Sequence, residues 1–348
     1  MKTHPPEDAP RLTEAFIALA TGTNEKAKRE ASFGPTRHDV RLLRGFVEDA
    51  QGLPAGSRAM EKHLGYRICM INGTEPPEMM SVYSDVRSHA GTWAAHEQAI
   101  QDRGERMLFL ARHMIDDVGD VEDGLDDGSM RVELMSELLH GVHSRAVDET
   151  KQVQATAKAL LEFSSHIRDV LNVKIEDKTK LSEATEHDTD NHMQRARLKR
   201  QLVTIKKAEK NYARVLDTDE GNILGRRLAR TVFAEDAVSA YDAVHDACYA
   251  LKKSAGEVAI MFRVPKSLAN RRVQLGYAML GSHSASQGLR HLGVLWETCA
   301  AALGAAAEAF DAAKDTAGRK AAVTALQPLM DAWAKLPVLT ETIDDIFR

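Results

Sequence analysis

The sequence predicts an all-α protein in the form of an elongated helical rod, and three observations carry this prediction. First, 43% of its 348 residues are hydrophobic but only 5% are aromatic, and Ala, Leu, Glu, Lys and Arg are abundant, as in long helices. Second, proline, the strongest helix breaker, is absent from residues 78–264. Third, apolar residues recur every seven positions, as in a coiled coil. No alternating strand pattern bounded by turn residues is present.

The first quarter of the chain is punctuated by proline and predicts short helices. We expect an N-terminal helical arm over residues 1–34 and tail-domain helices over residues 35–128. One of these covers residues 37–51, with Thr36 as its N-cap. Another is opened by Pro76 and Pro77 and ends in the acidic run 116–128, after which Ser129 can cap the next helix.

The next segment, residues 129–215, predicts one outgoing stalk helix with a coiled-coil seam. Continuous helix over residues 130–215 would be about 130 Å long, which indicates a rod. The seam weakens over residues 176–197 and resumes at Leu198. Its first five heptads consist of Val132, Leu139, Ala146, Val153, Leu160 and Ile167, with Met135, Val142, Phe163 and Val170 at the companion position.

The second half of the sequence predicts a helix that returns antiparallel to the outgoing stalk helix. The seam restarts near residue 231, so we expect a return stalk helix over residues 234–317, kinked at Pro265. Two stalks of similar length make a long antiparallel hairpin the simplest arrangement. Its apex would be a small head over residues 216–233, and a C-terminal tail helix over residues 318–348 would pack beside the first quarter of the chain.

Composition excludes several classes of protein. A net charge of -5 gives no global basic footprint for nucleic acid. Three scattered cysteines are too few for a disulfide framework or a zinc site. Neither a signal peptide nor an apolar run long enough to span a bilayer is evident, so we expect a soluble chain that needs no cofactor.

Catalytic and metal-binding patterns are weak. The acidic run 116–127 lacks the alternating ligand spacing of a calcium loop, so a solvated helix end is the better interpretation. Glu137 with His140, and Asp242 with His245, have the spacing of di-iron bundles. In a long hairpin these pairs would lie roughly 90 Å apart and could not share a metal. Without a nucleophile triad or nucleotide-binding fingerprint, the sequence predicts a protein that is not an enzyme.

Several segments, in order along most of the chain, resemble the alpha-xenorhabdolysin family of binary toxins, relatives of the cytolysin A type helical pore-formers. The resemblance implies a helical tail, a coiled-coil stalk, a membrane-contacting head, a partner that is the second toxin subunit, a higher oligomer on the target-cell membrane, and cell lysis. The segments are residues 36–47 (TRHDVRLLRGFV), 53–54 (LP), 64–66 (LGY), 82–93 (VYSDVRSHAGTW), 108–111 (LFLA) and 289–296 (LRHLGVLW).

The head departs from that family, whose members carry a Gly-rich apolar stretch there. Three acids and three arginines lie among only a few large apolar residues in 216–233, which cannot span a bilayer. The segment suits the membrane interface, with an apolar side and an arginine side. An exposed helical tip is the alternative for this segment, and a coiled-coil scaffold or membrane-curving protein is the alternative for the chain. The candidate membrane-contact residues are Ile223, Leu224, Arg226, Arg227, Leu228, Arg230, Val232 and Phe233.

Overall fold

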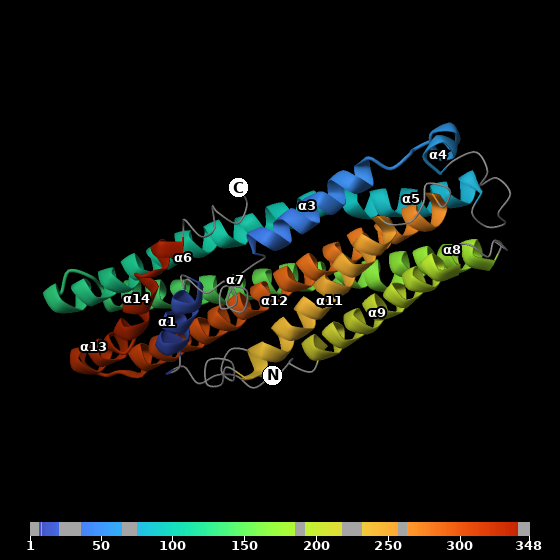
Figure 1. Ribbon diagram of the computed structural model, residues 1–348. Coiled ribbons are helices and arrows are strands. Elements are labelled where there is room, and N and C mark those ends of the chain that lie inside the picture. Colours follow the sequence, from blue (N-terminus) through green and yellow to red (C-terminus); the bar gives the residue numbers. More distant parts are fainter. Residues whose placement is uncertain are drawn as a thin grey trace.

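The computed structural model describes residues 7, 9–20, 36–64, 75–184, 192–217, 232–256 and 263–339. These residues form helices joined by short turns, with no strand among them, so the all-α prediction is confirmed. Figure 1 shows an elongated bundle. In order the elements are α1 (Ala9–Ala20), α3 (Arg37–Gln51), α4 (Ser57–Leu64), α5 (Pro76–Gly91), α6 (Trp93–Asp127), α7 (Val132–His166), η3 (Ile167–Leu171), α8 (Asn172–Ala184), α9 (His192–Asp217), α11 (Val232–Gly256), α12 (Arg263–Ala312), α13 (Thr316–Thr324), α14 (Gln327–Trp333) and η6 (Leu336–Leu339).

Helices α7 and α12 form the central antiparallel pair. The Ser164 hydroxyl reaches the Met279 carbonyl and the Ser286 hydroxyl donates to the Ala157 carbonyl, which fixes the register of the pair. The predicted seam is the buried stripe of α7: Leu139, Ala146, Val153 and Leu160 are fully buried. A seven-residue apolar repeat therefore identified the core of this helix correctly.

A single π-helical turn, η3, displaces the seam. A π turn inserts one extra residue into a helix, so the buried stripe moves on by one position. Ile167 is buried as predicted, but Val170 is half-exposed and Leu171 takes its place in the core. Ile175 continues the displaced stripe into α8. The heptad pattern is thus accurate only up to the π turn.

The prediction of one outgoing stalk helix over residues 129–215 is wrong. The Lys206 ammonium lies 2.8 Å from the Glu176 carboxylate. These residues would be about 45 Å apart in one continuous helix, since each residue rises 1.5 Å. The chain therefore reverses between α8 and α9. The polar stretch at residues 176–197 that weakens the seam includes this reversal, because a turn needs no apolar face.

The predicted return stalk over residues 234–317 is also two helices. Gly276 of α12 lies so close to Cys248 of α11 that a Cβ added at Gly276 would be 2.7 Å from the Cys248 sulfur. His245 and Tyr277 are likewise neighbours, with ring centroids 5.6 Å apart. Helices α11 and α12 are therefore antiparallel. Pro265 lies in the first turn of α12, where proline is well tolerated, and it begins that helix rather than kinking it.

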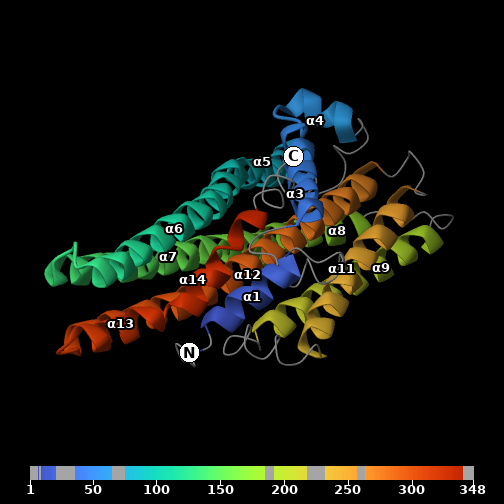
Figure 2. The same cartoon turned by 90° about the vertical axis from the view of Figure 1, so that its left-hand side faces the viewer.

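These two reversals make α9 and α11 a hairpin folded back along the body. Figures 1 and 2 both show α9 and α11 side by side next to α12. The predicted 130 Å helix is absent from the described residues. The longest helix, α12, has 50 residues and is about 75 Å long. The molecule is elongated, and residues 218–231 of the predicted head lie outside the described residues.

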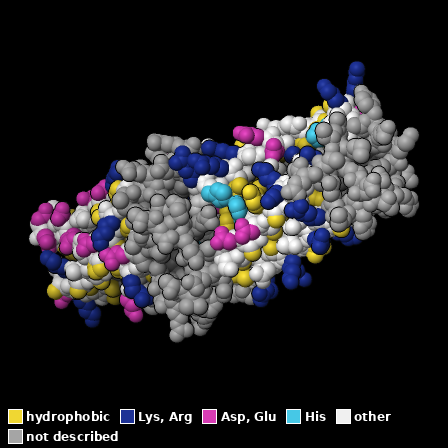
Figure 3. Space-filling model, viewed as in Figure 1, with side chains coloured by type: hydrophobic (Ala, Val, Ile, Leu, Met, Phe, Trp, Pro, Cys, Tyr) yellow, Lys and Arg dark blue, Asp and Glu magenta, His cyan; other side chains and the backbone are white. Residues whose placement is uncertain are grey.

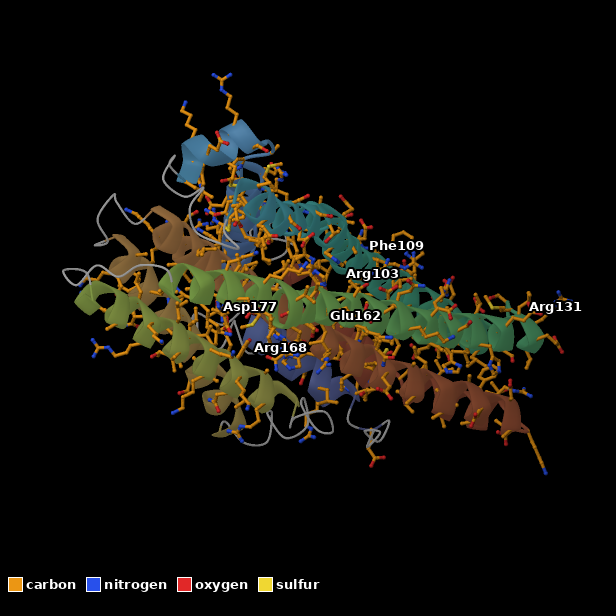
Figure 4. The ribbon with its side chains drawn as sticks, turned by 90° about the vertical axis from the view of Figure 1, so that its right-hand side faces the viewer. Arg103, Phe109, Arg131, Glu162, Arg168 and Asp177 are labelled. Carbon is orange, nitrogen blue, oxygen red and sulfur yellow. The ribbon has the colours of Figure 1, made fainter. Side chains whose placement is uncertain are left out.

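Helices from the first and last parts of the described chain pack together. Helix α14 packs on α1, where the Trp333 indole N–H donates to the Thr13 hydroxyl at 3.2 Å, and Trp333 contacts Trp296 edge to face. Figure 4 shows Arg131 at the far end of the α6–α7 pair. Helix α6 continues through the acidic run, because Val118 and Val121 are buried at helical spacing.

The end of α6 corrects a further sequence expectation. The helix ends at Asp127, where Gly128 adopts a left-handed conformation with φ 69° that glycine tolerates best. The next helix has Arg131 as its N-cap with no side-chain hydrogen bond, so Ser129 does not cap it. The predicted helix over residues 37–51 and its Thr36 cap are confirmed, with a complete capping box.

Chemical cross-linking tests the first reversal. We expect a short bis-maleimide to join Glu176→Cys to Lys206→Cys within one molecule, because the two native side chains meet in an ion pair. Cys248 and Cys299 are buried and burial raises the pKa of both thiols, so they should react slowly. Each single variant is the control. Absence of an intramolecular product in the double variant would support the continuous helix instead.

Candidate membrane-contact hairpin

The candidate membrane-contact residues lie between α9 and α11. Val232 and Phe233 begin α11, and only their backbone is described. Among the described residues, no helix is both long and apolar enough to cross a membrane. The other candidates fall outside the described residues: Ile223, Leu224, Arg226, Arg227, Leu228 and Arg230.

The hairpin buries an apolar face against α12. Glycine at position 276 permits this close approach, since an added Cβ would also be 3.3 Å from Ile205. Tyr212 and Tyr241 meet edge to face between the two arms of the hairpin, with ring centroids 6.1 Å apart. The buried apolar residues of the hairpin include Leu198, Ile205, Tyr212, Tyr241, Val244, Cys248 and Leu251.

A buried ion pair joins α9 to α12. The Arg272 guanidinium donates to both carboxylate oxygens of Glu209, at 2.8 and 2.5 Å. The Arg272 side chain is 1% exposed and that of Glu209 is 4% exposed. Burial disfavours the charge on Arg272, but the adjacent Glu209 outweighs it, so the pKa of Arg272 is raised. Arg272 is therefore charged, and it depends on the Glu209 carboxylate for its compensation.

A second polar contact joins the other arm of the hairpin to α3. Asp39 is fully buried and its carboxylate accepts from the Tyr241 hydroxyl at 2.8 Å and the Ser284 hydroxyl at 2.9 Å. The same carboxylate closes the capping box of α3 by accepting from the backbone N–H of Thr36 at 2.9 Å. Asp39 thus connects the N-terminus of α3 to α11 and to α12.

A buried histidine lies under α9. His283 of α12 contacts Tyr212 edge to face, and its Nε2 atom has no hydrogen-bond partner. Burial lowers the pKa of His283 to about 3, and the positive charges of Arg168 and Arg290 act in the same direction, against a weaker opposing effect of Asp169. The closed hairpin therefore holds His283 in its neutral form.

Sequence reasoning missed these polar contacts, although one signal was present. Glu209 lies between Ile205 and Tyr212, where the apolar seam of α9 would place a hydrophobic residue. Glu149 occupies a seam position of α7 in the same way, and it is buried and paired with Arg103 and Arg106 of α6. An acid at a seam position can therefore mark a buried ion pair, whereas the identity of its partner cannot be inferred from spacing.

The two pairs with di-iron spacing do not come together. His140 of α7 lies 2.8 Å from Asp311 near the end of α12, while His245 lies against Tyr277. Positions 277 and 311 are about 50 Å apart along α12. Within the described ranges, no group of three or more His, Cys, Asp or Glu side chains is arranged to hold a metal ion. Two acids of the α6 run form ion pairs with neighbouring helices: Asp117 pairs with Arg145, and Asp126 pairs with Lys320.

The fold defined by these helices is that of subunits of α-helical pore-forming toxins. The chain is similar to the HblL1 toxin component of Bacillus cereus, with a TM-score of 0.56, 11% identity, and coverage of 99% of this chain and 98% of that one. It is also similar to a chain of the YaxAB pore complex, with a TM-score of 0.50, 16% identity, and coverage of 90% and 96%.

A third similar structure is XaxA from Xenorhabdus nematophila, with a TM-score of 0.48, 15% identity, and coverage of 89% of this chain and 97% of that one. No protein-family model matches the sequence, and no curated protein sequence matches it either. At these identities the likeness concerns the fold, and at that level the resemblance seen in the sequence is confirmed.

Removing one member of the buried ion pair should loosen the hairpin. We expect Glu209→Gln to lower the free energy of unfolding by about 3–5 kcal/mol, because Arg272 is left as an uncompensated buried charge. Adding Arg272→Met should recover much of this loss. Urea unfolding measures both. As control, Lys151→Gln breaks an exposed pair with Asp148 and should change the value by less than about 1 kcal/mol. If Glu209→Gln and Lys151→Gln lowered the free energy of unfolding equally, a buried pair would be contradicted.

Mild acid should also weaken the closed hairpin. Neutral His283 in the closed form has a pKa far below that of an exposed histidine, so the opened form binds the extra proton. The contribution of neutral His283 to the free energy of unfolding is fully present above about pH 6.5 and is lost as the pH falls toward 3. Between pH 7 and pH 5 we expect a loss of about 2 kcal/mol in urea unfolding.

The matched variant for this pH effect is His283→Leu, which removes the titrating group. It should lose less stability over the same pH interval. Part of the fall should persist, because burial also lowers the pKa of His89, to about 4, with a smaller effect from neighbouring His166. An identical pH profile in wild type and variant would contradict a role for His283.

Proposed function

We propose that this chain is a non-catalytic subunit of a multi-component α-helical pore-forming toxin. In this proposal it is released from the producing cell, contacts the target-cell membrane through residues 216–233, and assembles with a second toxin subunit into a higher oligomer that lyses the cell. Nucleic acid is not a partner. One observation supports the proposal: the two helices of a hairpin that is folded against the body by side-chain contacts are connected in sequence by a segment with an arginine-bearing amphipathic pattern.

The hairpin is built so that it can leave the body. Within α9 and α11 the backbone hydrogen bonds run inside each helix, and the contacts to α12 and α3 are made by side chains. Helices keep their backbone groups satisfied in water and at a lipid interface alike. Apolar surface now covered by α12, such as that of Ile205, would become available to lipid or to a partner subunit.

The similar structures support the same role. The HblL1 neighbour is described as a toxin component and the YaxAB neighbour as a pore complex. Each aligns over most of its own length and most of this chain. The non-toxin alternative, a coiled-coil scaffold or membrane-curving protein, gives no reason for an amphipathic segment at the tip of a detachable hairpin.

Dye release from vesicles tests the proposal. We expect little release by this chain alone, and strong release once the product of the neighbouring open reading frame is added. Leu228→Asp should lower lipid affinity at least thirtyfold, because a buried leucine contributes on the order of 2 kcal/mol and the charge adds a desolvation cost. Its fold should be unchanged.

The matched control is Leu134→Asp on α7, which places the same charge at an exposed leucine of the body. It should leave vesicle binding and release unaltered. Release at nanomolar concentration by this chain alone would contradict a multi-component toxin. Unaltered binding and release in Leu228→Asp would remove residues 216–233 from the mechanism.

A further inference from the structure

Helix α9, which leads into the 216–233 segment, carries a large excess of positive charge. Its two acidic residues are Glu209 and Asp217, and Glu209 is buried against Arg272, so it does not offset charge on the outer surface. The net charge of -5 for the chain conceals this local excess. The basic residues of α9 are Arg195, Arg197, Lys199, Arg200, Lys206, Lys207, Lys210 and Arg214.

Most of this charge lies on one side of the helix. At 100° per residue, six of these side chains fall within an arc of about 120°, opposite the buried Leu198, Ile205 and Tyr212. They extend over about 22 Å of helix. Figure 3 shows Lys and Arg gathered over the region that α9 occupies in Figure 1. We call this surface the α9 basic face; it consists of the exposed residues Lys199, Arg200, Lys206, Lys207, Lys210 and Arg214.

The surroundings neutralise this face only in part. Glu176 of α8 pairs with Lys206, and Asp242 and Asp246 are exposed on α11. Lys252 and Lys253 of α11 are exposed and add positive charge. Figure 3 shows acidic side chains, together with Lys and Arg, at the end of the molecule where α6 ends, and further acidic side chains near the middle. The α9 basic face is therefore a local excess of positive charge on a chain whose net charge is -5.

A lipid surface suits this face better than another polyanion. Val203 lies in the middle of the basic residues and is 62% exposed, and a basic helix with an apolar side chain on its outer face is typical of membrane-surface binding. The helix is also continuous in sequence with the proposed membrane segment, which adds Arg226, Arg227 and Arg230. An anionic bilayer attracts each such cation within a Debye length.

We propose that the α9 basic face is a docking surface for bilayers that contain anionic phospholipid. It holds the closed protein at the membrane by the outer side of α9 before the hairpin opens. This inference rests on the proposed function and adds the lipid class and the surface that meets the lipid first. The docking is electrostatic, so it should depend on salt and need no partner subunit.

Co-sedimentation of the full chain with vesicles tests the docking surface. The probes are neutral phosphatidylcholine vesicles and vesicles with added phosphatidylglycerol, at low and at high salt. We expect binding to the anionic vesicles only, weakening steeply as salt rises. The triple variant Arg200→Gln, Lys207→Gln and Lys210→Gln should bind anionic vesicles on the order of a hundredfold more weakly at low salt, about fivefold per charge.

The matched control removes the same charge elsewhere, by Lys151→Gln, Lys158→Gln and Lys320→Gln, all at exposed positions. It should keep wild-type binding. Equal losses of affinity for anionic vesicles in the two triple variants would overturn the docking surface. Wild-type binding that does not change with salt concentration would overturn it as well. So would binding of single-stranded DNA without any binding of vesicles. If the α9 triple variant still binds anionic vesicles and still releases dye when the partner is added, the docking role of α9 is refuted and the proposed function stands.

Discussion

The buried ion pair between Glu209 and Arg272 is the contact on which the position of the hairpin depends. Apolar packing alone would tolerate a slip of α9 along α12, since one leucine-sized contact can replace another. A slip of one turn, about 5.4 Å, would separate two charges that water does not reach. The Asp39 carboxylate adds a second fixed point through Tyr241. Two polar contacts thus set the register of the hairpin against the body.

The same contacts make the closed state conditional. A buried charge is stable only while its partner is present, and neutral His283 is stable only while it is kept from water. Separating α9 from α12 exposes both to solvent, where Arg272, Glu209 and His283 can be hydrated. Opening is therefore less unfavourable than the loss of the same number of apolar contacts, and no backbone hydrogen bond within a helix has to break.

Charge is distributed along the rod in a way that the overall composition conceals. Acidic residues near the C-terminal end of α6 and basic residues of α9 lie at different places along the bundle. The reversal between α8 and α9 shortens this separation, because it folds α9 back along the bundle beside α8 and α12. In the proposed docking, the α9 basic face meets the lipid first.

The sequence by itself determined the all-α fold, the buried stripe of α7, the Thr36 cap, and the amphipathic pattern of residues 216–233, whose membrane contact stays a prediction. These are local properties, written in residues a few positions apart. The tertiary structure alone decided where the chain reverses. The polar stretch at residues 176–197 is equally compatible with a solvated helix and with a turn. Pairs such as Glu209 with Arg272, distant in sequence, settle the choice, and helical periodicity carries no information about them.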